Sequence, residues 1–376
     1  MENIEKMLEN DSIGLDVESK LMINPHLRII FTSSDEILVK HSARSPFSRV
    51  IRDEGQTKLI GRLLRSLSGP ATMATLIKAM DISEEQTDSA IELAQYLVDE
   101  KVLINPEFDV VQLYLDTIIG ASNTLAEQSV ALIGCGFLGK RFAQQLLELG
   151  VGNLTLIDDR KVSEPKIEAR LFGINSKNLK KGKAYTECVK NHLDLFGLDT
   201  KISCASGLED EEKLKKAFGA HDLVVVVWEC LSSKFFHTVN KVSIDTNKPW
   251  LLVHTDGSEA YVGPFFIPGE SACYSEYEVQ CEASALGVKD EYLTYKESLD
   301  QIKLDSAPLV LPCYMDMAAA TAATAVMHFM CNDESFLVGR CVRHDFERLT
   351  VDYEEVLRLP RCPACAPYRP YRHSFL

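Results

Sequence analysis

The sequence contains no apolar run approaching the roughly 20 residues that a membrane-spanning helix needs. Its first residues, MENIEKMLEND, are acidic and lack the apolar centre of a secretory signal. Positive charge is also scarce, because 40 lysines and arginines face 55 aspartates and glutamates, which leaves a net charge of −15. Such a balance disfavours general binding to nucleic acid. We therefore expect a cytoplasmic protein that binds neither membranes nor nucleic acid.

Cysteine is too sparse for a disulfide scaffold, since 11 cysteines are scattered over 376 residues. Reduced thiols and one metal site are the expected use of these residues. Apolar residues make up 46% of the chain and charged residues 25%, as in an ordinary globular protein. The length allows one large domain and one small one.

The clearest pattern is a nucleotide-binding βαβ unit. Residues 130–133 form an unbroken apolar run, as expected of a strand buried on both faces. Glycines in GxGxxG spacing follow, which allow a tight turn, the close approach of a phosphate and close packing of the next helix. These glycines are Gly134, Gly136 and Gly139. After an amphipathic helix, a second strand at 154–157 ends in Asp158, which is placed to bind a ribose.

Residues 1–110 have a different pattern and are expected to form a separate domain. The predicted elements are strands at 27–31 and 36–39, helices at 58–67 and 71–80, a third helix from residue 83, and a short wing strand at 101–104. Ser83 and Gln86 predict a capping box for the third helix. This order is typical of a winged helix, but the third helix has no basic cluster for DNA. The arrangement resembles the peptide-recognition domains of peptide-modifying enzymes, and a dimerisation subdomain is the alternative.

Residues 111–376 are expected to form the nucleotide-binding domain. Predicted strands alternate with helices from residue 128 to about residue 252, which is typical of a parallel sheet. The further predicted strands are 202–204, 223–227, 250–253 and 349–357. Small residues at 315–329 predict a closely packed helix. The expected fold class is α/β, a Rossmann-like domain with a small N-terminal winged-helix domain.

Four segments, GCGFLG, GVGNLTLIDD, HTDGSEAYVGPFFIPGESACY and CPAC, resemble the ThiF/MoeB/HesA family of adenylating enzymes. The resemblance covers residues 120–366 and is greatest to the peptide-modifying branch, which includes microcin C and pantocin biosynthetic enzymes. It implies a ThiF-type fold, ATP on the glycine loop, a substrate carboxylate activated as an acyl adenylate, and a homodimer. It also implies that the N-terminal domain binds the leader of a ribosomal precursor peptide. We expect the leader to add as an extended strand beside residues 27–31 or 36–39.

The resemblance assigns the phosphate and ribose contacts to the three glycines and Asp158. Other positions depart from the family pattern, because Tyr185 replaces the phosphate-contacting lysine and Cys230 replaces the magnesium-binding aspartate. We therefore assign magnesium to the neighbouring Glu229. The cations that remain for the phosphates are Lys166, Arg170 and Lys183. We also assign a catalytic role to Arg170 and Lys183. The alternative is a vestigial nucleotide site with solvated charges.

The family's structural zinc site uses two CxxC pairs, and this chain retains one of them, Cys362 and Cys365. Cys273 matches the first cysteine of the other pair, whereas Glu276 stands at the second position. The resemblance therefore implies zinc bound by these three cysteines, with either Glu276 or Cys281 as the fourth ligand. A degenerate site with reduced thiols is the alternative.

Two further candidates follow the strand at 250–253, where open α/β sheets place their ligands. His254 and Asp256 are expected to handle the substrate carboxylate or a proton. A structural role for a buried His254 is the alternative.

The resemblance thus implies ATP-dependent activation of glutamate side chains on a ribosomally synthesised precursor peptide, followed by cyclisation in antibiotic biosynthesis. An acyl phosphate in place of an adenylate would serve the same purpose. One alternative is a non-catalytic ThiF-like partner that binds the leader peptide for another enzyme. Another is an NAD-dependent dehydrogenase, which shares the glycine fingerprint but does not account for the CxxC pair.

Overall fold

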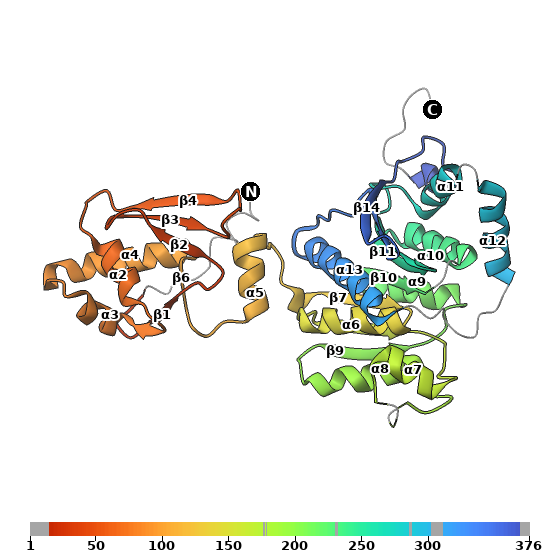
Figure 1. The fold of residues 1–376 in the computed structure, drawn as a ribbon, viewed down its shortest axis with the longest axis horizontal. Helices are drawn as coiled ribbons and strands as arrows, with labels where there is room; N and C mark the ends of the chain where they lie inside the picture. The colour runs from red at the N-terminus through yellow and green to blue at the C-terminus, as the bar shows by residue number, and fades with distance from the viewer. Residues whose placement is uncertain are drawn as a thin grey trace. The chain divides into compact units, whose positions relative to one another are not determined.

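The computed structural model describes residues 15–175, 177, 179–229, 232–285, 288–301 and 311–368. The chain forms two compact units that divide between Ala121 and Ser122 (Figure 1). Cys230, which stands where the family has a magnesium ligand, lies outside the described residues. No helix in the described ranges is long and apolar enough to cross a bilayer.

The first unit contains a winged helix. Its elements are β1 (Lys20–Ile23), α2 (Leu59–Ser66), β5 (Ala71–Thr72), α3 (Met73–Met80), α4 (Thr87–Asp99) and β6 (Leu103–Ile104), followed by α5 (Val110–Tyr114) and a π-helical turn (Leu115–Ile119). Strand β1 pairs antiparallel with β5 and β6, so β6 is the wing that the sequence predicts at 101–104. Leu63, Leu76 and Leu97 from the three helices share one buried core.

A three-stranded antiparallel sheet is added to this winged helix. Its strands, in spatial order, are β2 (Arg28–Phe31), β3 (Glu36–Lys40) and β4 (Ser48–Arg52). The strands predicted at 27–31 and 36–39 are confirmed as β2 and β3, which pair as an antiparallel hairpin. Strands β1 and β4 were not predicted, because they have no clear sequence pattern. The capping box predicted at Ser83 and Gln86 is wrong. Ser83 precedes a 3-10 turn, Glu84–Gln86, and its side chain makes no capping hydrogen bond.

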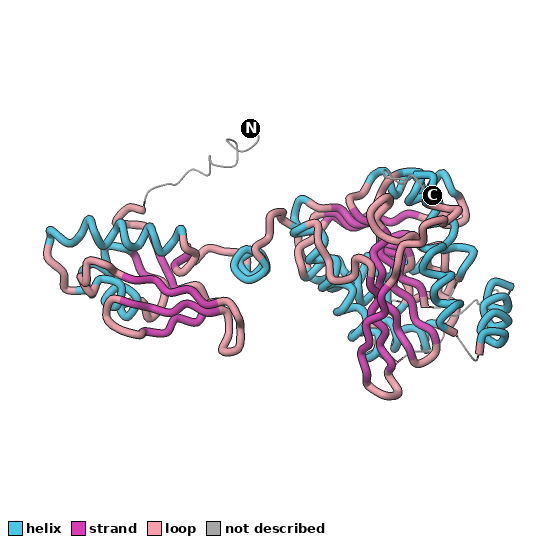
Figure 2. Tube along the Cα trace, turned by 90° about the horizontal axis from the view of Figure 1, so that it is seen from above, coloured by secondary structure: helices cyan, strands magenta, loops and turns pink. Residues whose placement is uncertain are grey.

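The second unit is built on an eight-stranded sheet with helices packed against it (Figure 2). The strands, in spatial order, are β14 (Thr350–Glu355), β13 (Arg340–Asp345), β12 (Glu259–Phe266), β11 (Trp250–Asp256), β10 (Leu223–Trp228), β7 (Ser129–Ile133), β8 (Asn153–Ile157) and β9 (Lys201–Ala205). The five from β11 to β9 are parallel, and the other three extend the sheet in antiparallel fashion. The predicted α/β fold class is confirmed.

The helices of this unit connect and cover the strands. They are α6 (Phe137–Glu148), α7 (Pro165–Phe172), α8 (Tyr185–Leu193), α9 (Glu211–Ala220), α10 (Ser233–Thr246), α11 (Tyr274–Ser284), α12 (Lys289–Gln301) and α13 (Pro312–Asn332), with 3-10 turns at Leu125–Glu127, Asp194–Phe196 and Ala366–Tyr368. Helix α13 confirms the predicted small-residue helix, and its buried alanines allow close contact with α6 and β12.

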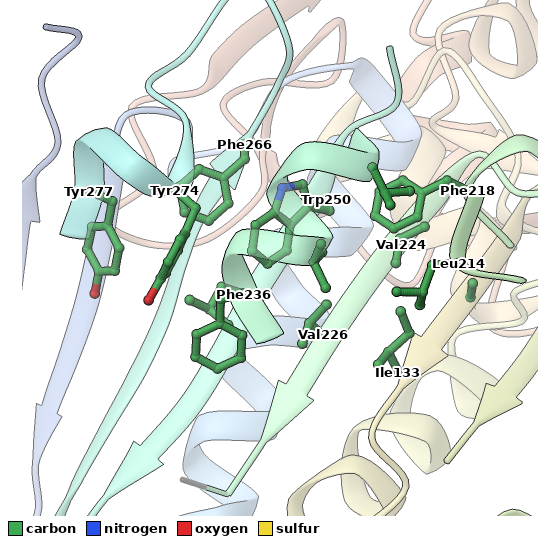
Figure 3. Packing of buried hydrophobic residues seen from close by; sticks show 14 of the residues in the cluster. Ile133, Leu214, Phe218, Val224, Val226, Phe236, Trp250, Phe266, Tyr274 and Tyr277 are labelled. Carbon is green, nitrogen blue, oxygen red and sulfur yellow. The ribbon is translucent and has the colours of Figure 1, made fainter. Parts of the chain in front are cut away.

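One hydrophobic cluster joins the sheet to α9, α10 and α11 (Figure 3). Val224, Val226 and Trp250 from β10 and β11 are fully buried in it, together with Phe218 and Phe236 from α9 and α10. The apolar run of β10, LVVVVW, is buried along almost its whole length, as the sequence predicts for a strand covered on both faces. The cluster holds β7, β10 and β11 in register, which fixes the relative positions of their carboxyl ends.

Candidate functional site

The carboxyl ends of β7 and β10 form the part of the sheet where a nucleotide is expected. After β7 the chain continues outward through β8 and β9, and it then returns to form β10 on the other side of β7. Open α/β sheets bind their ligands at such reversals of strand order, outside the carboxyl ends of the strands. The glycine loop directly follows β7 and Glu229 directly follows β10, so both lie at this reversal.

Close backbone packing requires two of the predicted glycines. Gly134 has φ +96°, a conformation that favours glycine, and a Cβ there would overlap the carbonyl oxygen of Val227. A Cβ at Gly139 would overlap the carbonyl oxygen of Gly134, so the first turn of α6 packs directly on the loop. These positions have the roles in the turn and in helix packing that the GxGxxG spacing predicts.

A carboxylate of the protein itself lies at the amino end of α6. Gly136 directly precedes the helix, and a Cβ on it would overlap the carboxylate of Glu229. The Leu138 N–H donates to Oε1 of Glu229 over 3.0 Å, and Glu229 is only 1% exposed. Helix amino ends favour anions because their N–H groups lack helical partners. Glu229 therefore occupies a position at which a phosphate would receive the same donors.

Arg160 joins Glu229 to Asp158. Its guanidinium donates to Oε2 of Glu229 over 2.9 Å and to Oδ2 of Asp158 over 2.8 Å. The buried Asp158 also accepts the Cys135 N–H over 2.6 Å. Although burial lowers the pKa of Arg160, the two carboxylates raise it well above its ordinary value. The predicted ribose ligand and the predicted magnesium ligand are thus held in one ion-pair network.

Sequence analysis did not identify Arg160 as a site residue. Its guanidinium lies 5.3 Å from the ring centre of Tyr185 and 5.2 Å from that of Trp228. These rings come from α8 and from the end of β10. The signal available in the sequence was an arginine only two residues after Asp158, but a charge in a loop is more commonly solvated.

The three predicted phosphate cations make no ion pair with Asp158 or Glu229 within the described ranges. Lys166 and Arg170 are exposed and lie about one turn apart on α7. Lys183 is half-buried, and its carbonyl accepts the Val162 N–H over 2.9 Å, so its segment runs beside the one that follows Arg160. The roles of these cations toward a nucleotide stay predictions.

His254 and Asp256 lie in a different place. They line a cavity of about 480 Å³ between β11–β14 and helices α11 and α12, together with Cys281. The His254 ring stacks on Tyr261 with the ring centres 4.8 Å apart, and burial lowers the pKa of His254 to about 4. His254 is the β-sheet partner of Trp228, so the cavity lies one strand away from the end of β10.

A cluster of possible metal ligands joins the start of α11 to the CPAC segment. Ligand atoms of Cys273, Glu276, Cys362 and Cys365 all lie within 4.8 Å of one another, and all four residues are buried. Cys281, the other candidate for the fourth position, is not part of this cluster, because it lies further along α11 and lines the cavity. Glu276 is held in place by the Cys273 N–H, which donates to its Oε2 over 2.8 Å.

The model of the ThiF family matches residues 112–365, which is more than half of the chain. The chain belongs to the ThiF family. This membership confirms the family resemblance seen in the sequence and removes the basis for the dehydrogenase alternative. No curated protein matches the sequence at a significant level.

Several solved structures share the fold of this ThiF protein over most of its length. The microcin C7 biosynthetic enzyme MccB in complex with N-formylated MccA is 18% identical, with a TM-score of 0.61, and 92% of this chain and 99% of that chain are covered. The structure of E. coli MccB alone is 18% identical, with a TM-score of 0.62, and 94% of this chain and 99% of that chain are covered. The structure of PaaA is 17% identical, with a TM-score of 0.59, and 89% of this chain and 99% of that chain are covered. The likeness confirms the predicted ThiF-type fold with its N-terminal domain.

Proposed function

We propose that this ThiF protein uses ATP to activate carboxylates of a ribosomally synthesised precursor peptide. The observation that carries the proposal is the position of the glycine loop at the reversal of strand order. Asp158 accepts a hydrogen bond from this loop, and Gly136 leads directly into the amino end of α6. Structures of the similar enzyme MccB include complexes with ATP and with MccA. An acyl adenylate or an acyl phosphate would turn a poor leaving oxygen into a good one.

Nucleotide binding on this loop requires a rearrangement of the ion-pair network. A phosphate would take over the Leu138 N–H from Glu229, and Arg160 would exchange a carboxylate for a phosphate. Guanidinium groups bind both anions with similar geometry, so this exchange replaces one charge-assisted contact with another. Asp158 is proposed to bind the ribose. The further phosphate cations that we propose are Lys166, Arg170 and Lys183.

Glu229 does not fit a magnesium ion in the arrangement described. One of its oxygens accepts a hydrogen bond from the Leu138 N–H, and the other accepts one from the Arg160 guanidinium. Magnesium needs carboxylate oxygens with room for octahedral coordination. The assignment of magnesium to Glu229 stays a prediction, and it requires that Arg160 first leave the carboxylate.

Zinc fits the cluster of Cys273, Glu276, Cys362 and Cys365. Thiolates and a carboxylate are zinc ligands, and four of them complete a tetrahedral structural site. The residues are buried and already close together. We propose that zinc, when bound, ties the start of α11 to the CPAC segment, which lies 89 residues further along the chain. Its role would be structural.

The N-terminal unit is proposed to bind the leader of the peptide as an added β-strand, which relies on main-chain hydrogen bonds. The sheet order limits where this strand can lie. Docking along residues 36–39 is wrong, because β3 is already paired with β2 on one edge and β4 on the other. Strand β2 is an edge, as that prediction requires, and exposes Ile30, whereas β4 is a second edge that the sequence did not reveal.

The finer parts of the proposal come from the family resemblance. The activated groups would be glutamate side chains, and attack by a neighbouring peptide nitrogen or carbon would close rings in antibiotic biosynthesis. Mass spectrometry of candidate peptides incubated with the protein and ATP tests this ring closure. The proposed homodimer is tested by light scattering of the purified chain.

The site assignment is tested by ATP binding and by peptide-dependent ATP consumption. Asp158→Ala is expected to weaken ATP binding by about 1–3 kcal/mol, the scale of a hydrogen bond to a charged group. Lys183→Ala is expected to lower turnover more than binding, because a cation near the phosphates acts on charge that develops in the transition state. Lys216→Ala, at an exposed lysine of α9, is the matched control. Equal consumption by wild type and all variants would refute the assignment.

One observation favours a second function, that of a non-catalytic partner that only binds a leader peptide. The Glu229–Arg160 pair fills the position expected for a phosphate, and Glu229 is almost completely buried there. Absence of ATP binding by the wild-type protein, together with retained binding of a candidate leader peptide, would support this function over catalysis.

A further inference from the structure

The cavity that contains His254 has aromatic walls. It lies between the carboxyl-terminal part of β11, the antiparallel strands β12–β14 and helices α11 and α12. Four tyrosines line it, namely Tyr261, Tyr274, Tyr277 and Tyr292. Figure 3 shows Tyr274 and Tyr277 side by side on α11 with their hydroxyl groups pointing the same way. At about 480 Å³, the cavity has the volume of a typical ligand pocket.

Acidic groups outnumber basic groups in this cavity. Among its lining residues, Asp256, Glu278 and Glu354 face only two cations, Lys296 and Arg343. The ion-pair partners of those cations add three more carboxylates, Glu282 beside Lys296 and both Glu259 and Asp345 beside Arg343. On the basic side, the partners of the lining acids add His237, which pairs with Glu278. The cavity therefore has more negative charge than its own side chains neutralise.

Several hydrogen-bond donors in and around the cavity are already engaged by carboxylates of the protein. Lys296 Nζ donates to Glu278 over 2.7 Å and to Glu282 over 2.6 Å. Arg343 Nε donates to Glu259 over 2.9 Å, and the hydroxyl of Tyr261 donates to the same residue over 2.6 Å. Since these donors are paired within the protein, the groups left for a ligand are mainly acceptors: carboxylate oxygens, tyrosine lone pairs and an imidazole nitrogen.

Among the described residues, some acceptors in the cavity lack a hydrogen-bond donor or a positive charge to balance their burial. His254 is 5% exposed, and its Nδ1 has no hydrogen-bond partner within the described part of the chain. Its pKa is lowered to about 4 by burial, so the ring is neutral near pH 7 and one nitrogen can accept a hydrogen bond. Burial also raises the pKa of Asp256, against the hydrogen bond from Tyr295, and burial raises the pKa of Glu354. These groups would be stabilised by a donor that carries positive charge.

We infer that this cavity binds a cationic side chain, an ammonium or a guanidinium group, held by Asp256 and Glu354 and by the tyrosine rings. Cations bind favourably over the faces of aromatic rings, and their several N–H donors match the surplus of acceptors. If the proposed function holds, the occupant is a lysine or arginine of the precursor peptide. Because β11 adjoins β10 and β10 adjoins β7, such a side chain would position the peptide two strands away from β7, which leads into the glycine loop.

The test uses the full-length protein without nucleotide and three small probes. The cationic probe is Nα-acetyl-lysine N-methylamide, the neutral probe is the norleucine analogue and the acidic probe is the glutamate analogue. Binding is followed by NMR of histidine-labelled protein, in which His254→Phe identifies the His254 ring signal. The lysine probe is expected to shift this signal with at least tenfold higher affinity than either other probe.

Variants locate the probe in the cavity. Glu354→Gln is expected to weaken binding of the lysine probe at least fivefold, whereas the matched control Glu355→Gln, at the neighbouring exposed residue of β14, leaves it unchanged. Tighter binding of the glutamate probe, no shift of His254 with any probe, or equal affinity in Glu354→Gln would overturn the inference. Since no nucleotide is present, these outcomes are independent of whether the protein consumes ATP.

Discussion

Replacing Arg160 with methionine tests the energetic role of the network at the glycine loop. Arg160 pairs with Asp158 and Glu229, whose side chains are 0% and 1% exposed. Methionine keeps apolar bulk against Tyr185 and Trp228 but removes the charge, so both carboxylates stay buried without their ion-pair partner. Breaking a buried ion pair in this way typically costs about 3–5 kcal/mol. We expect the free energy of unfolding of the second unit to fall by that amount.

Urea denaturation followed by tryptophan fluorescence measures this loss. The 2 tryptophans of the chain, Trp228 and Trp250, both lie in the second unit, so the signal reports the unfolding of that unit. The matched control is Arg348→Met, because the Arg348 side chain is 79% exposed and its Nε lies 3.8 Å from Asp345. An exposed pair of this kind contributes less than about 1 kcal/mol.

A double variant separates the loss of charge pairing from the loss of packing. Adding Glu229→Gln to Arg160→Met removes one of the two unpaired charges while keeping the side-chain volume. If uncompensated charge is the main cost, the double variant should regain about 1–3 kcal/mol relative to the single variant. A single-variant loss below about 1 kcal/mol, or no recovery in the double variant, would refute the reasoning.

Three further predictions concern other parts of the chain. Protein purified without chelator should contain about one zinc per chain by metal analysis, Cys362→Ser should lose it, and a value near zero in wild type would contradict the site. The pKa of His254 is near 6.5 in the unfolded chain and about 4 when folded, so the unfolded state binds its proton first and stability should fall by up to about 3 kcal/mol as the pH drops through this window. Urea titrations at several pH values should show a weaker dependence for His254→Phe, and parallel profiles would contradict this. Deleting residues 1–105 should abolish leader-peptide binding in a titration while the nucleotide-binding unit stays folded, and unchanged affinity would contradict the proposed role of that domain.

The sequence by itself determined the features that depend on neighbouring residues. The apolar run before Gly134, the glycine spacing and the acid at Asp158 predict the βαβ unit, because each feature reflects local strand, turn and helix geometry. The small residues of α13 and the buried run of β10 were equally clear. Strands β12 and β13 were not predicted. Strand β12 contains Gly263 and Pro264, residues that usually mark turns or strand interruptions, and β13 contains charged residues among its apolar ones.

Only the tertiary structure decided which distant side chains meet. Glu229 reaches the amino end of α6 from a position 91 residues beyond Leu138, and it does so because β10 is the spatial neighbour of β7. The same placement selects Arg160 as its partner. No sequence spacing encodes such contacts, because they depend on the order of strands in the sheet and not on their order in the chain.

The fourth position of the cysteine cluster shows the same division. The sequence allowed either Glu276 or Cys281, since both follow Cys273 closely. In the structure, Glu276 lies in the first turn of α11, where its carboxylate accepts the Cys273 N–H, whereas Cys281 lies further along the helix and lines the cavity. The sequence determined that cysteines near residues 273 and 362 were available. The packing of α11 against the CPAC segment decided that Glu276, and not Cys281, joins them. A helix presents residues to a neighbour according to their place on its turns.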